Sequence, residues 1–245
     1  MPQTPIAVIT MAGLGSRFRK VGYTIPKFQI EARGKPLFDW AMHSLQQFID
    51  QGSPFVFIAR QEDNAADFIC QQSAQLGITQ YDVIEIDHLT DGQATTALFA
   101  ENVIPDPQRP FFVYNIDTYV EPQYLPADEV RGDGWIPCFP GEGDAWSFVK
   151  VDANNQAVEV AEKRRISPHA TVGLYYFSSF ALYKAIYQAF YVEAAGPAQK
   201  ERYIAPMYGW MIAHQHPVFI HEIPVAGVHP LGTPDEVDRF KTEAS

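Results

Sequence analysis

The sequence predicts an α/β protein in which an open, mostly parallel, twisted sheet is flanked by helices and continues into a less regular, mixed second half. Apolar runs of strand length alternate with helix-like segments over the first 120 residues, and the first run ends in a glycine-rich turn. After residue 134, strand-like segments follow one another with little helix between them. Strands separated by helices are typical of parallel pairing through crossover connections.

The elements of the first half follow a regular order. Strands are expected where short apolar runs are bounded by turn residues, at 6–10, 54–59, 81–86 and 110–117. Helices are expected where apolar residues recur every three to four positions, at 37–49, 64–76 and 93–102.

The second half has a different pattern. Strand-like segments cover 135–140, 145–152, 157–163 and 171–177. Helical patterns return at 179–193 and 201–214, and a strand at 217–223 precedes a short helix after Thr233. The sequence contains no repeat, linker or low-complexity tract, so we expect residues 1–245 to form a single domain.

Composition narrows the class of protein. Of the 245 residues, 47% are hydrophobic and 19% charged, as in ordinary globular proteins, and the formal net charge of −11 argues against nucleic acid or an anionic membrane as partner. Cys70 and Cys138 lie far apart and match no metal-site spacing, which is typical of reduced cytosolic thiols. Neither a membrane span nor a signal peptide is visible, so we expect a cytoplasmic protein.

A glycine-rich loop follows the first strand, with Gly13 and Gly15 in the stretch "MAGLGSRF". Glycines adopt backbone conformations that other residues resist, so such a loop can direct N–H groups toward a phosphate at close range. No G-K-[ST] follows, and Phe18 stands where the dinucleotide fingerprint has glycine, so neither better-known phosphate loop fits. By itself the pattern is also compatible with a simple tight turn.

Two cations set this loop apart. Arg17 stands two residues after Gly15, and Lys27 comes ten residues after Arg17, directly after Pro26. Because proline fixes its own φ, Lys27 lies on a stiff segment. A guanidinium that binds two oxygens at once, together with an ammonium, suits a triphosphate that loses pyrophosphate.

Several motifs, in order, resemble the nucleoside-triphosphate transferase family of sugar-phosphate nucleotidyltransferases, or pyrophosphorylases. They are "MAGLGSRF…IPKF…GKPLFDW", "DGQATTA", "YNID" and "EVAEKRRISPHATVGLYYF". The resemblance implies a Rossmann-like fold of the nucleotide-diphospho-sugar transferase type, with a nucleotide-binding half at 1–120 and a substrate-binding half at 121–245. The opening segments are similar to those of members from bacterial surface-polysaccharide pathways, which implies a role in capsule or envelope supply.

The family's reaction is attack of a substrate phosphate oxygen on the α-phosphorus of a nucleoside triphosphate, with release of pyrophosphate. The resemblance implies that Arg17 neutralises the β and γ phosphates and that Lys27 neutralises the α-phosphate. It assigns the nucleotide to the loop and to the D-G-x-A turn, at Ala12, Gly13, Gly15, Ser16, Asp91 and Gly92. The identity of the phosphorylated substrate stays open: family members and related enzymes use sugar phosphates, phosphocholine or polyol phosphates. The oligomeric state also stays open, and a homo-oligomer is one alternative.

Asp117 ends a predicted parallel strand, where α/β sheets place ligand residues. The resemblance assigns it to Mg²⁺, which phosphates and water also coordinate; the alternative is a turn or helix-cap aspartate. Many family members have a second metal aspartate in a D-x-G-T segment, but here Pro230 stands in its place. His229 and Asp235 lie nearby, and we expect the metal to depend on Asp117 alone.

Glu162 and Lys163 begin a charged run that includes Arg164 and Arg165. Such a run is ordinarily a solvated surface. The resemblance nevertheless assigns Lys163 to the incoming phosphate and Glu162 to a substrate hydroxyl, and Gly173 to the family's G-L-Y-x-F segment.

Two other functions compete with this one. A glycosyltransferase of the same architecture would use an acidic motif such as "NID" to hold the metal of a nucleotide-sugar, but it has no use for the loop with Arg17 and Lys27. A non-catalytic nucleotide-sensing module is the other alternative, favoured by the loss of the second metal position.

The base preference follows from the residues before the D-G turn. In related thymidylyl- and uridylyl-transferring enzymes a glutamine reads the pyrimidine there, whereas this chain has Glu85 and Asp87 and no amide in "EIDHLT". A carboxylate only accepts hydrogen bonds, which suits the amine of cytosine and repels O4 of uracil. The sequence therefore favours CTP, unless backbone groups read the base.

Overall fold

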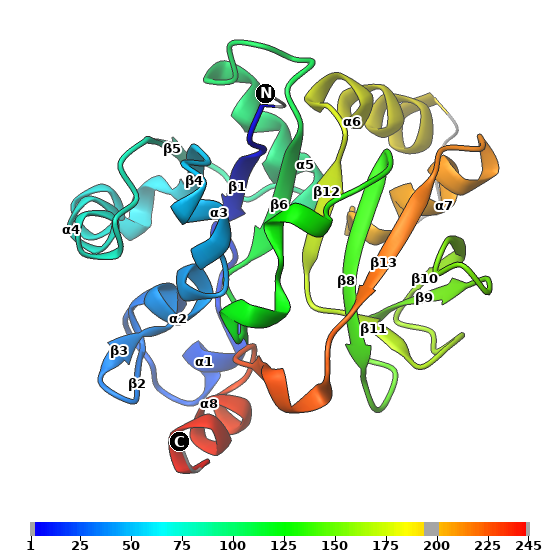
Figure 1. The fold of residues 1–245 in the computed structure, drawn as a ribbon. Helices are drawn as coiled ribbons and strands as arrows, with labels where there is room; N and C mark the ends of the chain where they lie inside the picture. The colour runs from blue at the N-terminus through cyan, green and yellow to red at the C-terminus, as the bar shows by residue number, and fades with distance from the viewer. Residues whose placement is uncertain (1–2, 194–200, 244–245) are drawn as a thin grey trace.

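The computed structural model describes residues 3–193 and 201–243. Within these residues ten strands form one sheet in the order β10-β9-β11-β8-β12-β6-β1-β4-β5, with β13 paired to β8, as Figure 1 shows. The strands of this sheet are β1 Ile6–Thr10, β4 Phe55–Arg60, β5 Tyr81–Ile86, β6 Phe111–Asn115, β8 Gly134–Pro140, β9 Ser147–Val151, β10 Ala157–Glu162, β11 His169–Thr171, β12 Leu174–Phe177 and β13 Val218–Glu222. Two small sheets pair β2 Glu31–Ala32 with β3 Lys35–Pro36 and β7 Thr118–Val120 with β14 Val228–Pro230.

The helices lie close to where the sequence predicts them. They are α1 Ser16–Lys20, α2 Leu37–His43, α3 Gln46–Asp50, α4 Ala66–Leu76, α5 Gln93–Leu98, α6 Phe180–Tyr187, α7 Ala205–Ala213 and α8 Pro234–Thr242. A 3₁₀ turn covers Lys27–Gln29, another extends α5 over Phe99–Asn102, and a π turn over Gln188–Glu193 extends α6. None of the helices in the described parts of the chain is both long and apolar enough to cross a membrane.

Several predicted elements differ from the observed ones. The strand predicted over 110–117 ends at Asn115, so Asp117 lies in the turn between β6 and β7. The helix predicted over 37–49 is two helices that separate at Ser44. The Ser44 hydroxyl donates back to the Trp40 carbonyl at 3.3 Å, a contact that bends helices, and accepts from the Val120 amide at 2.9 Å. The strand predicted over 171–177 is split at Gly173, whose φ of +84° is not an extended conformation. The helix predicted over 201–214 begins only at Ala205, so residues 201–204 are free to make the contacts described below.

The sheet is parallel in its first half and mixed in its second. Strands β5, β4, β1 and β6 pair in parallel, and Ala7, Val8 and Ile9 at the centre of β1 are fully buried, as expected for a strand covered on both faces. The change occurs at β12, which pairs antiparallel with both β6 and β8. This arrangement confirms the predicted α/β class with its less regular second half.

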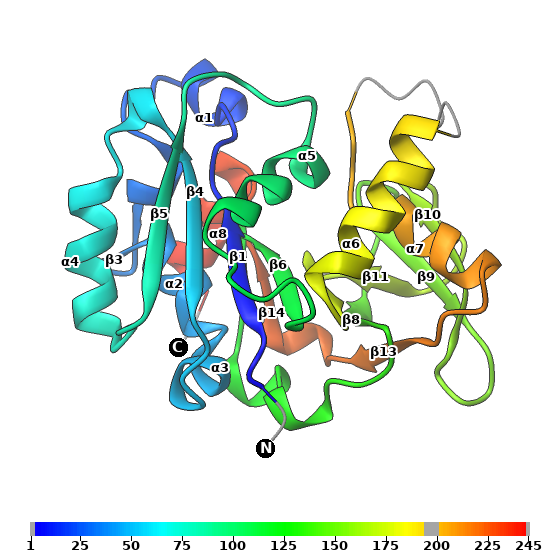
Figure 2. The same ribbon diagram turned by 90° about the horizontal axis from the view of Figure 1, so that it is seen from above.

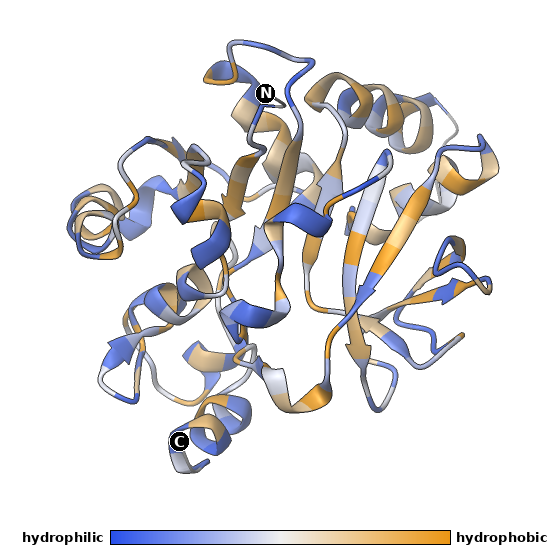
Figure 3. Cartoon of the chain, viewed as in Figure 1, coloured by the Kyte–Doolittle hydropathy of each residue, from blue (hydrophilic) through white to orange (hydrophobic). Residues whose placement is uncertain are grey.

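Two layers of helices cover the sheet, and the alternation of side chains along β1 decides which residues meet each layer. Ala7 and Ile9 pack with the apolar residues of α2, α3 and α4, whereas Ile6 and Val8 pack with those of α5, α6 and α7. Figure 2 shows these two groups of helices on opposite sides of the strands, and Figure 3 shows the apolar colouring concentrated on the strands between them.

The carboxyl ends of the parallel strands lie at one edge of the sheet, where open α/β folds bind ligands. The glycine-rich loop follows β1 at this edge, and a short turn after β6 leads to β7. Strand β14 pairs with β7, so that the C-terminal helix α8 packs beside α1 through Phe18, Leu231 and Phe240. Helix α8 therefore lies next to the loop that follows β1 (Figure 1).

Candidate active site

The glycine-rich loop is held against the sheet and opens toward solvent. The Met11 amide donates to the Ile58 carbonyl at 2.9 Å, which fixes the start of the loop, and Ala12 is buried. Gly13 has nothing within 4 Å of the position a Cβ would take, so the chain leaves space above it. Gly15 has a φ of +60° and lies close to Lys27. If Gly15 carried a Cβ, that atom would lie 3.6 Å from the Cβ of Lys27.

Two exposed side chains, Ser16 and Arg17, begin the short helix α1. Among the described residues, Arg17 has no hydrogen-bonding or ion-pairing partner. Phe18, in contrast, is buried and anchors the helix in the core shared with α8. The local pattern thus directs one side chain inward and leaves the guanidinium free to bind an anion.

Lys27 and Asp117 form an ion pair beside this loop, with 3.2 Å between Nζ and Oδ2. Lys27 is on the 3₁₀ turn after Pro26 and its side chain is only 13% exposed, while the Asp117 carboxylate is 41% exposed. The Lys27 ammonium also lies 5.6 Å from the centre of the Phe18 ring. The structure therefore brings together Lys27 and Asp117, which the sequence placed at the same site from separate motifs.

The C-terminal segment lies directly against Asp117. The Leu231 amide donates to the Asp117 carbonyl at 2.8 Å, and Pro230 pairs with Thr118 in the β7–β14 ladder. A Cβ on Gly232 would lie 3.5 Å from Oδ2 of Asp117 and 3.3 Å from Oε2 of Glu236. Gly232 thus leaves room beside the Asp117 carboxylate.

The donor set at this position is small. Within residues 3–193 and 201–243 no group of three or more histidine, cysteine, aspartate or glutamate side chains could hold a metal ion. Asp117 supplies one accessible carboxylate, and proline at position 230 supplies no side-chain oxygen. A single carboxylate fits a Mg²⁺ ion that takes its remaining ligands from substrate phosphates and water.

The turn at Asp91 and Gly92 packs against the segment that precedes α7. Gly92 has a φ of +148°, and a Cβ there would lie 2.4 Å from the Arg202 carbonyl oxygen, so only glycine fits. The Arg202 amide donates to the Asp91 carbonyl at 2.7 Å, and its guanidinium lies 3.0 Å from the Asp91 carboxylate. Sequence reasoning missed Arg202, because no motif connects it with the D-G turn.

Hydrogen bonds between polar side chains connect the start of α5 with the ends of β1 and β6. Gln93 donates through its side-chain nitrogen to Thr10 at 3.0 Å and also to the Asn115 side chain. Gly173, with its left-handed φ, passes so close that a Cβ there would lie 2.3 Å from the Asn115 side-chain nitrogen. Gly173 therefore supports the site through Asn115. The sequence offered only a weak signal for Asn115, its place at the end of a strand.

Glu162 and Lys163 lie at the end of β10, in the second half. Ser147 donates to the Glu162 carboxylate, whose pKa is raised by burial. Lys163 follows with a left-handed φ of +50°, and its ammonium donates to the Tyr203 hydroxyl, which raises the pKa of Lys163. Tyr203 is the second residue that sequence reasoning missed in this part of the site.

A hollow of about 420 Å³ lies beside the loop at the ends of β4 and β5. Leu14 and Leu89 border it as exposed apolar side chains, and Asp87 and His88 line it with polar groups. Asp87 lies 2.7 Å from the His88 ring, and this hydrogen bond lowers the pKa of Asp87. Glu85 is an exposed residue of β5 outside this hollow.

Comparison with solved structures shows what the chain is similar to. A nucleoside-diphosphate-sugar pyrophosphorylase from Vibrio cholerae RC9 is 35% identical, with a TM-score of 0.88 over 97% of this chain and 100% of that one. An inositol-1-phosphate CTP transferase from T. maritima has a TM-score of 0.75 at 15% identity, with 100% of both chains covered. A UDP-glucose pyrophosphorylase from Acinetobacter baumanii has a TM-score of 0.73 at 15% identity, over 98% of this chain and 92% of that one.

The two structures at 15% identity share the fold, and the Vibrio cholerae RC9 protein also shares sequence along the whole chain. No protein-family profile matches the sequence. A search of the curated proteins gives no match either.

Proposed function

Because this chain belongs to the family of sugar-phosphate nucleotidyltransferases, or nucleoside-diphosphate-sugar pyrophosphorylases, we propose that it joins a nucleoside triphosphate to a small phosphorylated substrate and releases pyrophosphate. The observation that carries this proposal is the Lys27–Asp117 pair beside the open glycine loop, with 3.2 Å between the charged atoms. A cation and a carboxylate at the end of a parallel sheet suit a metal-bound triphosphate.

The chain's own groups would bind and orient the triphosphate. Backbone N–H groups from Ala12 to Ser16 are available to the phosphates because Gly13 leaves open space above the loop. The free Arg17 guanidinium would hold the β and γ phosphates, and Lys27 would neutralise charge that develops on the α-phosphate. In the reaction the bond between the α-phosphorus and its β-bridging oxygen breaks, and pyrophosphate leaves.

Asp117 is the residue that would hold Mg²⁺, since its carboxylate is accessible and Gly232 leaves room beside it. When bound, Mg²⁺ neutralises phosphate charge and orients the reacting groups. Asp117 would exchange its partner Lys27 for this ion, which frees the ammonium for the α-phosphate.

The phosphorylated substrate would approach from the second half of the chain. Lys163, directly after β10, would hold its phosphate, and the half-buried Glu162 would accept a hydrogen bond from one of its hydroxyls. A phosphate oxygen of the substrate forms the new bond to the α-phosphorus. The positioning of two anions by fixed cations would supply most of the rate enhancement.

We infer cytidine as the base. The hollow bordered by Leu14 and Leu89 is beside the loop and open to a flat apolar ring, and Asp87 lines the same hollow. The His88 hydrogen bond lowers the pKa of Asp87. An ionised carboxylate can only accept a hydrogen bond, as the cytosine amine requires. The T. maritima protein, which shares the fold, is described as a CTP transferase, and this supports the proposal.

The test is pyrophosphate release from CTP, UTP, dTTP, ATP and GTP, each with Mg²⁺ and a panel of sugar 1-phosphates, phosphocholine and polyol phosphates. We expect release that depends on both substrates, and fastest with CTP. Transfer of the sugar from a nucleotide-sugar to an acceptor hydroxyl, with release of the nucleoside diphosphate and no pyrophosphate, would instead identify a glycosyltransferase. Tight nucleotide binding without any turnover would identify a nucleotide-sensing module. The same panel also tests the proposed role in surface-polysaccharide supply, which requires a sugar phosphate as substrate.

A further inference from the structure

A short segment, residues 201–203, connects the two halves of the proposed active site. It comes after α6 and its π turn in the chain and precedes α7. It contacts both the residue after β10 and the start of α5. We call these three residues, Glu201, Arg202 and Tyr203, the bridging segment. It matches none of the motifs by which the sequence resembles its family.

The middle residue of the bridging segment, Arg202, is fixed to the nucleotide side. The Ala94 amide at the start of α5 donates to the Arg202 carbonyl at 3.0 Å, and the Arg202 amide donates to the Asp91 carbonyl at 2.7 Å. The Arg202 guanidinium lies 3.0 Å from the Asp91 carboxylate. The requirement for glycine at position 92 is a consequence of this close approach.

The two outer residues, Glu201 and Tyr203, hold Lys163. The Lys163 ammonium donates to the Tyr203 hydroxyl, and that hydroxyl donates to the Glu201 carboxylate. The ammonium also lies 4.4 Å from the centre of the Tyr203 ring. Because Tyr203 gives its proton to Glu201, its oxygen is left to accept from Lys163, so the three groups form a chain with one direction.

The backbone of Lys163 is held by its own contacts, whereas its ammonium depends on the hydrogen bond to Tyr203. Lys163 has a φ of +50°, which disfavours any residue with a Cβ, and its amide is held by the Trp146 carbonyl at 3.0 Å. An exposed, flexible lysine on such a turn would otherwise sample many rotamers. The hydrogen bond to the Tyr203 hydroxyl restricts the Lys163 side chain to rotamers that point toward the bridging segment.

We propose that Tyr203, oriented by Glu201, is a positioning residue that holds the Lys163 ammonium where the phosphate of the incoming substrate binds. The assignment of that phosphate to Lys163 rests on the proposed function. Since the segment that carries Tyr203 is also fixed to Asp91, the lysine is positioned relative to the nucleotide side and not only to its own strand. Binding of the phosphorylated substrate thus depends on a residue that need not touch it.

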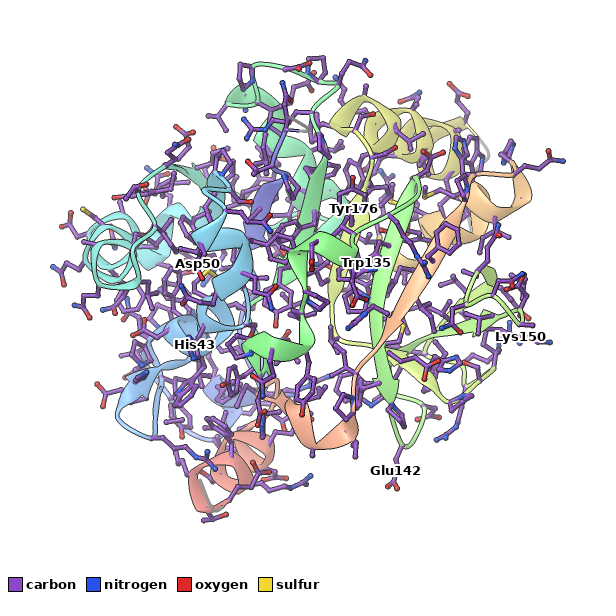
Figure 4. All side chains as sticks on the ribbon, viewed as in Figure 1. His43, Asp50, Trp135, Glu142, Lys150 and Tyr176 are labelled. Carbon is purple, nitrogen blue, oxygen red and sulfur yellow. The ribbon has the colours of Figure 1, made fainter. Side chains whose placement is uncertain are left out.

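The test uses Tyr203→Phe, which keeps the ring and removes the hydroxyl. With the best substrate pair of the panel, we expect KM for the phosphorylated substrate to rise about tenfold, the effect of losing one hydrogen bond to a charged group. KM for the nucleotide should stay unchanged, because Arg202 and its contacts to Asp91 remain. Tyr176→Phe removes a hydroxyl from β12, in the middle of the sheet in Figure 4, and should change neither value.

A second measurement needs no activity. Labelling of lysines by an amine reagent at fixed pH, read by peptide mass spectrometry, should increase at Lys163 in Tyr203→Phe, because the Tyr203 hydrogen bond both covers the amine and raises the pKa of Lys163. Lys150, an exposed lysine near the end of β9 that Figure 4 labels, is the internal reference. Glu201→Gln should give an intermediate increase.

Unchanged labelling at Lys163 would overturn the positioning role, and so would an equal rise in both KM values. Increased labelling in a protein that shows no turnover with any substrate pair would leave the contact established and refute the proposed function instead.

Discussion

The ammonium of Lys27 lies 3.2 Å from the carboxylate of Asp117, although the two residues come from opposite ends of the nucleotide-binding half. Lys27 belongs to the stiff Pro-Lys turn and Asp117 to the connection between β6 and β7. The pair places the anion and the cation that a metal-bound triphosphate requires next to each other.

Replacing Asp117 by asparagine keeps the shape and removes the charge. We expect activity to be lost at ordinary Mg²⁺ concentrations and recovered only in part at high concentrations, because one carboxylate carries the protein's share of the metal. A Mg²⁺ titration of the rate, with calorimetry of Mg²⁺ binding in the presence of CTP, measures this. Glu236→Gln, on the other side of Gly232, should keep the normal Mg²⁺ dependence; if it behaves like Asp117→Asn, the metal has two protein ligands.

Arg17→Ala should slow turnover strongly without unfolding the protein, since Arg17 is exposed and the helix is anchored by Phe18. Loss of a preorganised charge contact to a transferring phosphate typically costs about 3 kcal/mol, on the order of a hundredfold in rate. Arg19→Ala, an equally exposed arginine of α1, is the control and should retain its rate. Equal rates for the two variants would remove Arg17 from the site.

Lys27→Ala should slow turnover by a similar factor and should also lower the melting temperature slightly. The lysine is mostly buried against the Phe18 ring and neutralises Asp117, so its loss affects packing as well as charge. Comparison of kcat with the melting temperature separates the two effects. A wild-type rate in a destabilised protein would assign Lys27 to structure alone.

Asp87→Asn should reduce the preference for CTP over UTP. An amide can donate to O4 of uracil as well as accept from an amine, so the discrimination should fall by about tenfold, within the range of one to three kcal/mol for a side chain that reads a base. The ratio of kcat/KM for the two nucleotides is the measurement. Glu85→Gln, on the exposed edge strand outside the hollow, should leave the ratio unchanged. A wild-type preference for UTP would contradict the base assignment outright.

Glu162 carries a pH dependence of stability whose sign follows from its raised pKa. Burial raises this pKa in the folded protein, so between the ordinary glutamate value of about 4.3 and the raised value, the folded state binds more protons than the unfolded state. The free energy of unfolding therefore falls as the pH rises through this window. Glu162→Gln removes the charge while still accepting from Ser147, so at pH 7 it should melt at a higher temperature than the wild type and turn over more slowly. Parallel melting curves for the two proteins from pH 4 to pH 8 would contradict this account.

The sequence by itself determined the order of strands and helices, the parallel first half, and the residues of the loop and of the Lys27 turn. Local rules decide these features: apolar periodicity sets the elements, glycine sets the turns, and proline stiffens the segment before Lys27. The position of Asp117 after a predicted strand indicated the ligand-binding edge, because the ends of parallel strands share one edge, and the family resemblance assigned it to a metal.

Only the tertiary structure decided how the two halves are connected. Arg202 contacts Asp91, more than a hundred residues earlier in the chain, and Tyr203 contacts Lys163, forty residues earlier. No local preference encodes such pairs. The same is true of Gly92 and Gly173, whose lack of a side chain matters because Arg202 and Asn115 fill the space that a Cβ would need. Close packing between distant segments fixes these positions, and packing is a property of the folded chain rather than of any stretch of its sequence.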